Sequence, residues 1–359
     1  MDLDSVEVKC PTTKDIYLRC VFIKILKVDT VNELYSGEIF LQAKWREPLL
    51  DYSVETKNID FSHYWNPKLS ISNIFTENKI TISNEISIAK ETGRAYIVEK
   101  KRIRATFNET LELQHFPFDC QDLSVSVISD FSANEVKLNE CPHDLSKLNV
   151  VDGMDSQEWN LYKHVQVESK IISNECNIGP EKREVMIFTC RATRQFTYFI
   201  INYFMISSLL FLLTFTSFSV PSSNSYGRLA LCKTVLLTSV TFKVAVSHNL
   251  PKIPYLTYLD KTIYGNILMI MSICIWHAIT SLWFTDPTVN TAIGMNNLKP
   301  TEMIVALTIA SFYVLSVMIF GLTIYYDVGK QRRKMKQKDK DFENKIKQIL
   351  DENIFCEIC

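Results

Sequence analysis

A helix-length segment between Gly227 and Pro251 carries the pattern with the clearest chemical meaning. It reads GRLALCKTVLLTSVTFKVAVSHNLP, and although it lies among three long apolar runs it contains two lysines, an arginine and a histidine. A helix with these side chains cannot turn every face to hydrocarbon, because a charge at membrane depth needs a polar partner or water. One face of the segment is therefore expected to meet water.

One stripe of this predicted helix has a distinct composition. Its positions recur at steps of three and four residues, which confines them to an arc of roughly 100°. They are small, hydroxyl-bearing or apolar and include no carboxylate: Gly227, Ala230, Thr234, Leu237, Thr241, Val244 and His248. Several copies around an axis would enclose a channel with rings of hydroxyls and an apolar ring at Leu237, which can stop ions by dewetting. The segment is interpreted as a pore-lining helix over 228–248.

Three apolar runs without Asp, Glu, Lys or Arg accompany this segment. They cover 196–220, 262–284 and 303–326, and each exceeds the ~20 residues that cross about 30 Å of hydrocarbon. A buried core helix of a soluble protein is the alternative, which three runs of this length disfavour. Together the four helices predict a transmembrane bundle over 195–326 in a lipid bilayer, with both chain ends on one side.

Residues 1–194 have the pattern of an all-β domain. Several segments are rich in β-branched and aromatic residues with partial alternation, and clusters of turn-forming residues separate them. These segments are 17–27, 38–45, 79–88, 95–107, 123–128, 161–172 and 185–193. Short strands punctuated in this way favour an immunoglobulin-like sandwich over an α/β fold.

The charged tail, 327–359, keeps an apolar helical spacing at Phe342, Ile346, Ile349 and Leu350, which predicts a solvated helix or a short coiled coil. Basic residues crowd its start, and such clusters prefer the cytoplasm. This preference opposes an extracellular tail. Elsewhere acids balance the basic residues and the net charge is −1, so no nucleic-acid partner is expected.

No enzymatic centre, metal site or cofactor is expected. The six histidines lack helical metal-ligand spacing and no nucleophile motif occurs.

Asn108 begins a glycosylation sequon with Glu109 and Thr110. Cysteines before the membrane segments allow several disulfide pairings that the sequence leaves open: Cys10, Cys20, Cys120, Cys141, Cys176 and Cys190.

Short motifs follow one another in order along most of the chain. They are WREPL at 45–49, WNP at 65–67 with Asn73, FPFDCQ at 116–121 with alternating Leu123, Val125 and Val127, then Trp159, Arg194 and Leu250-Pro251. This order, with a polar second crossing, resembles the pentameric ligand-gated ion channels of the nicotinic acetylcholine receptor type, or Cys-loop receptors. The resemblance implies a multi-pass plasma-membrane protein, assembled as a homopentamer or heteropentamer.

In such an assembly an extracellular sandwich of about ten strands would bind a small-molecule agonist between subunits. The second crossing would line a central pore for inorganic ions. A non-conducting or auxiliary subunit is one alternative. A membrane-tethered β-sandwich binding protein is another, although it would leave the stripe without a purpose.

The resemblance also implies a coupling turn. Asp119 and Arg194 match a family ion pair at the base of the sandwich. Pro117 and Phe118 would press on the connection after the pore helix, which Pro251 stiffens. Movement of the sandwich would then tilt the pore helix. The alternative is a purely structural corner, since ion pairs are often architectural.

Two departures from the family concern its cysteines and its ligand site. The two cysteines that name the family would fall at Glu109 and Leu123, so the eponymous disulfide is absent. The positions that match the ligand pocket are Phe40 on the complementary side, and Ser72, Asp130 and Arg183 with neighbouring Phe131 on the principal side. This set lacks the aromatic box that holds amine transmitters. A choline-like agonist is disfavoured, and a zwitterion, a polar ligand or a vestigial pocket remains open.

Ion selectivity stays open as well, because the inner mouth has neither the acidic ring of cation channels nor the proline-alanine pair of anion channels. Arg228 lies about 150° from the stripe centre, which predicts an anchor at headgroups or at a neighbouring helix. Lys243 lies roughly opposite the stripe, and snorkelling or an unidentified acceptor must accommodate it.

Overall fold

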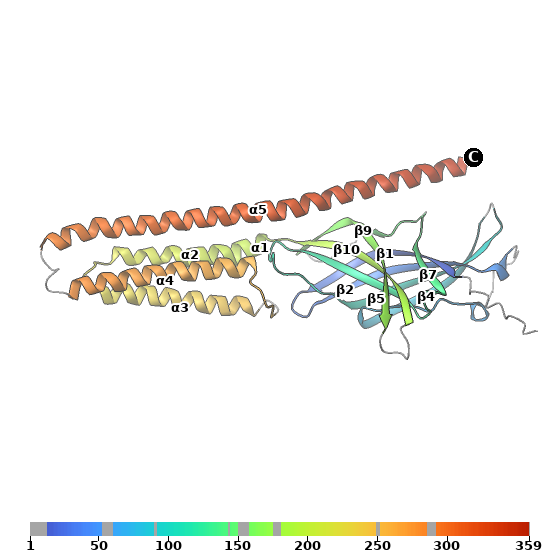
Figure 1. Ribbon diagram of the computed structural model, residues 1–359, viewed down its shortest axis with the longest axis horizontal. Coiled ribbons are helices and arrows are strands. Elements are labelled where there is room, and N and C mark those ends of the chain that lie inside the picture. Colours follow the sequence, from blue (N-terminus) through green and yellow to red (C-terminus); the bar gives the residue numbers. More distant parts are fainter. Residues whose placement is uncertain are drawn as a thin grey trace, which may run out of the picture. The chain divides into compact units, whose positions relative to one another are not determined.

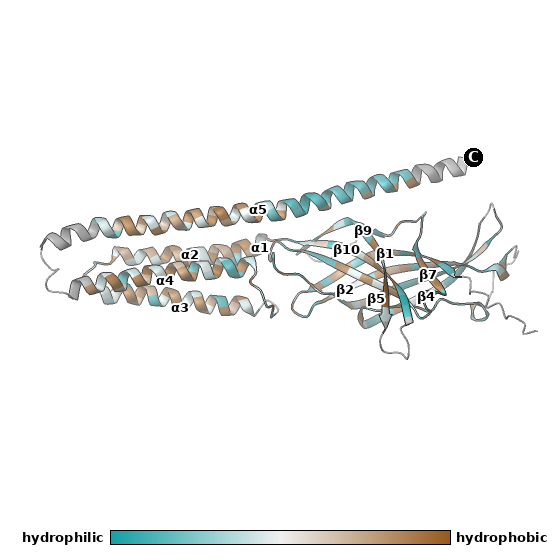
Figure 2. Cartoon of the chain, viewed as in Figure 1, coloured by the Kyte–Doolittle hydropathy of each residue, from teal (hydrophilic) through white to brown (hydrophobic). Residues whose placement is uncertain are grey.

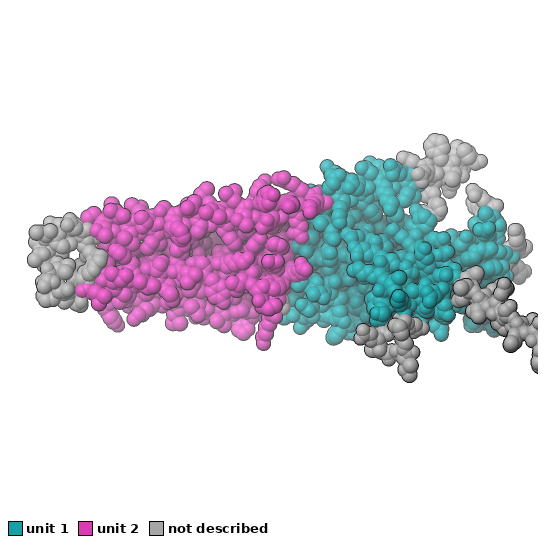
Figure 3. All heavy atoms as spheres, viewed as in Figure 1, with its two compact units in different colours: residues 1–111, 120–193, 335–359 teal, residues 112–119, 194–334 magenta. Residues whose placement is uncertain are grey.

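The computed structural model describes residues 13–51, 60–89, 92–142, 144–149, 158–174, 181–248, 252–285 and 292–358. They divide into two compact units, coloured separately in Figure 3. Unit 1 comprises the chain up to Leu111, residues 120–193 and the chain from Met335; unit 2 comprises 112–119 and 194–334. The turn 112–119 therefore belongs with the membrane helices, and the end of the tail belongs with the strands.

Ten strands among the described residues form the framework of unit 1. Their bounds are β1 (Lys14–Asp29), β2 (Leu34–Arg46), β3 (Leu69–Ile71), β4 (Ile74–Ile88), β5 (Ala95–Asn108), β6 (Cys120–Ser129), β7 (Val136–Glu140), β8 (Lys147–Leu148), β9 (Trp159–Asn174) and β10 (Glu181–Arg194). They pair in the order β3-β6-β10-β9-β8-β1-β2-β5-β4, with β7 added beside β1. Figure 1 shows them as arrows and labels most of them. The path folds into two layers around one core.

The core follows from alternation along the strands. In β2 every second residue from Tyr35 to Trp45 is buried, because successive side chains of a strand point to opposite faces. The Tyr35 and Phe107 rings stack with centroids 4.9 Å apart. Residues of β1, β2 and β5 meet residues of β6 and β10 in a single apolar cluster. The predicted all-β sandwich is confirmed.

Four helical stretches among the described residues are long and apolar enough to cross a membrane: 197–219, 225–247, 258–282 and 300–349, the last of which extends past Lys334, where unit 2 ends. The first consists of α1 (Thr197–Phe199), a π-helical stretch (Ile200–Met205), α2 (Ile206–Thr214) and a 3-10 stretch (Phe215–Ser219). The others belong to α3 (Ser225–Ser247), α4 (Tyr258–Thr285) and α5 (Ala292–Ile358). A sandwich followed by four apolar helices is the predicted fold class.

Helix α5 continues without a break through the charged tail. Figure 2 shows its residues changing from mostly hydrophobic to mostly hydrophilic toward the C-terminus. The tail was expected to be a solvated helix or a coiled coil. It is helical, but from Met335 onward it packs with unit 1. One face of this part of the helix is partly buried, because it meets side chains of the strands.

Cys20, Cys141, Cys190, Cys232 and Cys274 are free thiols. Cys10 and Cys176 lie outside the described residues. Cys20 on β1 and Cys190 on β10 are fully buried in the sandwich core, and burial raises the pKa of both thiols. Because the thiolate is the reactive form, these two act as apolar packing residues.

Candidate functional site

The predicted pore stripe lies on the unpacked face of α3. Gly227 is half-buried and the other six positions are exposed in the single chain, with Leu237 at 69% and Val244 at 52% exposure. The opposite face packs against the rest of unit 2 through a separate set of residues: Arg228, Cys232, Val235, Ser239 and Val246. The Asn224 side chain caps the helix by accepting a hydrogen bond from the Gly227 N–H at 3.0 Å. The helix thus leaves the broad face that carries this stripe uncovered.

Arg228 forms a buried ion pair at the beginning of α3. Its two terminal nitrogens donate to the carboxylate of Glu302 on α5 at 2.5 and 3.0 Å, and its Nε donates to the Val220 carbonyl at 2.8 Å. Arg228 is 2% exposed. A guanidinium held on both edges is fixed in orientation, so Arg228 anchors α3 to a neighbouring helix and points away from the stripe.

Lys243 finds its acceptor on α4. Its Nζ lies 2.7 Å from Asp260 Oδ1, and both side chains are largely buried. Asp260 also accepts from the N–H and hydroxyl of Thr257. The pair joins the C-terminal half of α3 to the beginning of α4 and neutralises a charge at membrane depth.

The Asp119–Arg194 pair is buried within unit 2. Arg194 Nε donates to Asp119 Oδ1 at 2.9 Å and Nη2 donates to Oδ2 at 3.3 Å, with exposures of 5% and 1%. The guanidinium also lies over the Phe116 ring, 4.9 Å from its centroid. Two hydrogen bonds and a ring contact offset the desolvation of both charges.

The turn at 112–119 packs directly on the residues that lead into α4. The Leu259 N–H donates to the Phe116 carbonyl at 3.4 Å, and the Leu113 N–H donates to the Tyr255 hydroxyl at 3.1 Å. Phe118 shares a buried cluster with Tyr258. Pro117 is buried in the same turn. Pro251 lies outside the described residues.

Glu109 and Ser124 close the loop where the family's disulfide is missing. The Glu109 carboxylate accepts from the Ser124 N–H at 2.6 Å and from its hydroxyl at 2.5 Å. Burial raises the pKa of the Glu109 carboxyl, and the two Ser124 hydrogen bonds oppose that rise. A pair of hydrogen bonds thus joins the residue at one predicted cysteine position, Glu109, to the neighbour of the other, Leu123. Asn108 of the sequon precedes Glu109 and is exposed at the end of β5.

Glu109→Ala is expected to destabilise unit 1 by about 1–3 kcal/mol, because it leaves the Ser124 N–H without its acceptor. Glu109→Gln keeps an acceptor oxygen and is the matched control, with less than half that loss. The thermal midpoint of the purified chain measures both. Equal midpoints for the two variants would show that Ser124 does not need this acceptor.

The principal-side residues gather on three neighbouring strands. Ser72 follows β3 and donates its hydroxyl to the Ser126 carbonyl at 3.3 Å. Asp130 and Arg183 each lie two residues beyond the last β6–β10 pair, Ile128 with Val185. Asp130 is exposed, and the neighbouring Phe131 packs on Trp65 with ring centroids 5.4 Å apart. Phe40 is on β2 in the other layer, so one chain does not bring it together with this group.

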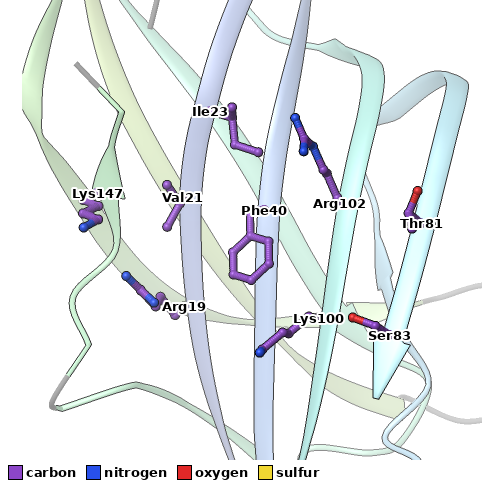
Figure 4. A pocket seen from close by; sticks show the side chains of 9 residues that line it. All are labelled: Arg19, Val21, Ile23, Phe40, Thr81, Ser83, Lys100, Arg102 and Lys147. Atoms are coloured by element: carbon purple, nitrogen blue, oxygen red, sulfur yellow. The ribbon is translucent and has the colours of Figure 1, made fainter. Parts of the chain in front are cut away.

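Phe40 instead lines an open cavity of about 430 Å³ on the outer face of β1, β2, β4, β5 and β8 (Figure 4). Val21, Ile23 and Phe40 supply its apolar surface, and Thr81 and Ser83 supply hydroxyls. Four basic side chains complete the lining: Arg19, Lys100, Arg102 and Lys147. This volume falls in the range of small-molecule sites.

Three carboxylates offset part of this charge. Arg102 pairs with Glu38, Lys100 pairs with Glu85, and Arg19 lies 3.8 Å from Asp144. The cations of β5 continue beyond the cavity to Arg104, which lines an adjacent hollow with Lys79. The surface around Phe40 therefore keeps an excess of positive charge.

These basic residues were missed in the sequence, although a signal was present. Lys100, Arg102 and Arg104 alternate along β5 and share one face, which strand spacing predicts. The neighbouring contributions of Arg19 and Lys147 depend on pairing between distant segments. Asp260 and Glu302 were missed as partners for the same reason.

Comparison with known proteins identifies the family. The neurotransmitter-gated ion-channel ligand binding domain matches residues 9–195, just over half of the chain. Over 273 residues the chain is 23% identical to gamma-aminobutyric acid receptor subunit beta-4 of Gallus gallus, covering 73% of this chain and 54% of that protein. Over 260 residues it is 24% identical to pH-sensitive chloride channel 2 of Drosophila melanogaster, covering 68% of this chain and 48% of that protein.

The chain spans about half the length of these two relatives. The matched domain covers the β-sandwich described above, and four apolar helices follow it. Members of this family are ligand-gated channels and not enzymes. By its domain, its fold and the order of its motifs, the chain belongs to the neurotransmitter-gated ion channels, the Cys-loop receptors.

Proposed function

We propose that the chain is a subunit of a pentameric ligand-gated ion channel of the plasma membrane, with its β-sandwich outside the cell. The observation that most directly supports this proposal is a face of α3 that none of the described residues of unit 2 cover. The six exposed stripe positions on this face run from Ala230 to His248, and they include the hydroxyls of Thr234 and Thr241 and the apolar side chain of Leu237. A stripe of this composition suits a water-filled pore that several copies enclose.

The ligand site of this proposal lies between two copies of the chain. Phe40 and the principal-side group occupy different layers of the sandwich, so a shared pocket needs one layer from each copy. The cavity around Phe40 would supply one wall. Asp130, Phe131 and Arg183 of the neighbouring copy would supply the other.

The agonist is a small molecule with an anionic group, such as a carboxylate, because the cavity wall around Phe40 is basic. Four cations line this cavity, and the charge excess extends to Lys79 and Arg104. Arginine and lysine bind carboxylates through charge-assisted hydrogen bonds. A quaternary amine would meet repulsion here and lacks an aromatic box.

Permeant anions are favoured by the composition of the pore helix. The sequence of α3 contains no Asp or Glu, and Lys233 is exposed beside the stripe. Basic rings favour anions in pores, whereas carboxylate rings favour cations. The name of the Drosophila relative describes a chloride channel. Replacing external chloride by a large organic anion should shift the reversal potential to more positive values.

Expression of the chain alone in cells without related channels tests the proposal. Currents are recorded under a panel of amino acids, amines and protons, and surface labelling confirms delivery. An agonist-evoked current supports a homomeric channel. Surface-delivered protein without current, in the parent and in Leu237→Thr, would reject the homomeric channel. Current that appears only on co-expression with a related subunit would then identify an auxiliary subunit.

Arg102→Gln is expected to raise the half-maximal concentration of a carboxylate agonist about tenfold, because a hydrogen bond between charged groups contributes about 1.5–3 kcal/mol. Lys44→Gln is the matched control. Lys44 lies four residues after Phe40 on the same face of β2, but it does not line the cavity. Concentration–response curves measure both. Equal shifts in the two variants would attribute the effect to overall charge and remove Arg102 from the site.

A further inference from the structure

The tail part of α5 presents one contact stripe to the strands of unit 1. Met335, Asp339, Phe342, Ile346 and Ile349 are partly buried, and their spacings of four, three, four and three residues put them on one face. The described residues between them are exposed. A free helix in water would not show one covered face. The apolar members of the stripe therefore have a surface to pack on.

A buried pair marks the centre of this contact. Asp339 Oδ1 lies 2.6 Å from the His164 ring Nδ1 on β9, and the same oxygen accepts from the His164 backbone N–H at 3.0 Å. His164 is 5% exposed, and the Asp339 side chain is 20% exposed. A carboxylate with two donors from one residue is held in position along the strand.

Polar contacts with β9 and β10 surround the pair, and a charge on the helix acts on β7. Lys163 on β9 donates to Glu343 at 2.7 Å, and Lys338 donates to Gln166 on β9 at 3.3 Å. Arg191 on β10 lies 3.0 Å from the Met335 sulfur. On β7, burial raises the pKa of the Glu140 carboxyl and the charge of Lys345 opposes that rise. Two of these contacts thus place a basic group of one element opposite an acidic group of the other: Lys163 with Glu343, and Lys345 with Glu140.

We propose that residues 335–349 are a clamp that docks on β9 and holds the β9–β10 hairpin in place. The docked segment is thus part of this chain's own α5, and the His164–Asp339 pair and the apolar stripe hold it on the strands. Because β9 pairs with β10, and β10 carries Arg183, the clamp limits the motion of one wall of the candidate ligand pocket. The docking itself does not depend on the proposed channel function.

Limited trypsin digestion of the purified full chain tests the docking. The tail offers Lys345 and Lys347 as cleavage sites away from the pair. In the parent these sites should resist trypsin, and Asp339→Ala should accelerate their cleavage about tenfold, the factor that 1.4 kcal/mol represents. Asp341→Ala is the matched control: the same change, two residues along the same helix, on an exposed side chain. Its cleavage rate should stay within about twofold of the parent, since exposed substitutions change stability little.

Hydrogen exchange measures how the loss of docking changes the mobility of β9 and β10, and it needs no agonist. Asp339→Ala should speed amide exchange in peptides from β9 and β10 several-fold and leave β2 and β5 unchanged, because only the clamped strands lose a contact. Rapid cleavage of the parent tail would overturn the docking, and so would equal cleavage of the Asp339 and Asp341 variants. Protected tail sites with unchanged β9 exchange in Asp339→Ala would overturn the hold on the hairpin. Neither result bears on channel activity.

Discussion

Leu237→Thr is expected to lower the agonist concentration for half-maximal current at least about tenfold, or to give current without agonist. Leu237 is the large apolar side chain at the middle of the uncovered α3 stripe, 69% exposed in the single chain. A ring of leucines excludes water from a narrow pore, and threonine admits it. Burial of a leucine side chain contributes about 1.5–3 kcal/mol, and every subunit contributes one. A tenfold shift corresponds to about 1.4 kcal/mol.

The same substitution off the stripe is the control. Leu231 is also exposed on α3, at 42%, but lies about 120° from Leu237 around the helix. Leu231→Thr should leave the concentration–response curve within about twofold, since exposed substitutions usually have small effects. Voltage-clamp recording measures both variants alongside surface labelling. A larger shift for Leu231→Thr than for Leu237→Thr would place the gate on another face of α3.

Local periodicity was enough to predict the main elements of the fold. The alternation in β2 and β5 and the lengths of the apolar runs are properties of single segments, so they can be read without tertiary knowledge. Strands β3, β7 and β8 have two to five residues and show no usable period. They form because longer neighbours supply their hydrogen bonds.

The partners of buried charges could not be predicted in the same way. The position of Lys243 on the helix requires an acceptor, but the choice of Asp260 depends on how α3 packs against α4. In the sequence, Glu109 showed only that a family cysteine is missing. Its hydrogen bonds to Ser124 could not be predicted, because they depend on how two chain segments meet. The tail's spacing predicted a helix, but its docking depends on His164 from a distant strand. A charge pattern thus indicates that a partner is needed, and the fold decides which residue provides it.

Loss of either member of the Asp119–Arg194 pair is expected to cost about 3–5 kcal/mol, because the remaining charge stays buried without its counter-ion. Both side chains are almost fully buried and share two hydrogen bonds. Asp119→Leu or Arg194→Met alone should therefore sharply reduce the amount of folded protein at the cell surface. The double variant should recover much of that loss, since replacing a buried pair by apolar residues is often neutral or stabilising.

Asp122 and Arg191 give this prediction a matched control. They form the same kind of pair on β6 and β10, with Nε 2.7 Å from Oδ1, but the Asp122 side chain is 51% exposed. Solvent screens such a pair, so Asp122→Leu should cost less than about 1 kcal/mol. Thermal midpoints of the purified variants and surface labelling measure the set. If the double variant Asp119→Leu/Arg194→Met is no more stable than the worse single variant, the pair is needed for its charges. Because Phe116 of the same turn bonds to the beginning of α4, those charges would then be required for the contact between the turn and the membrane helices.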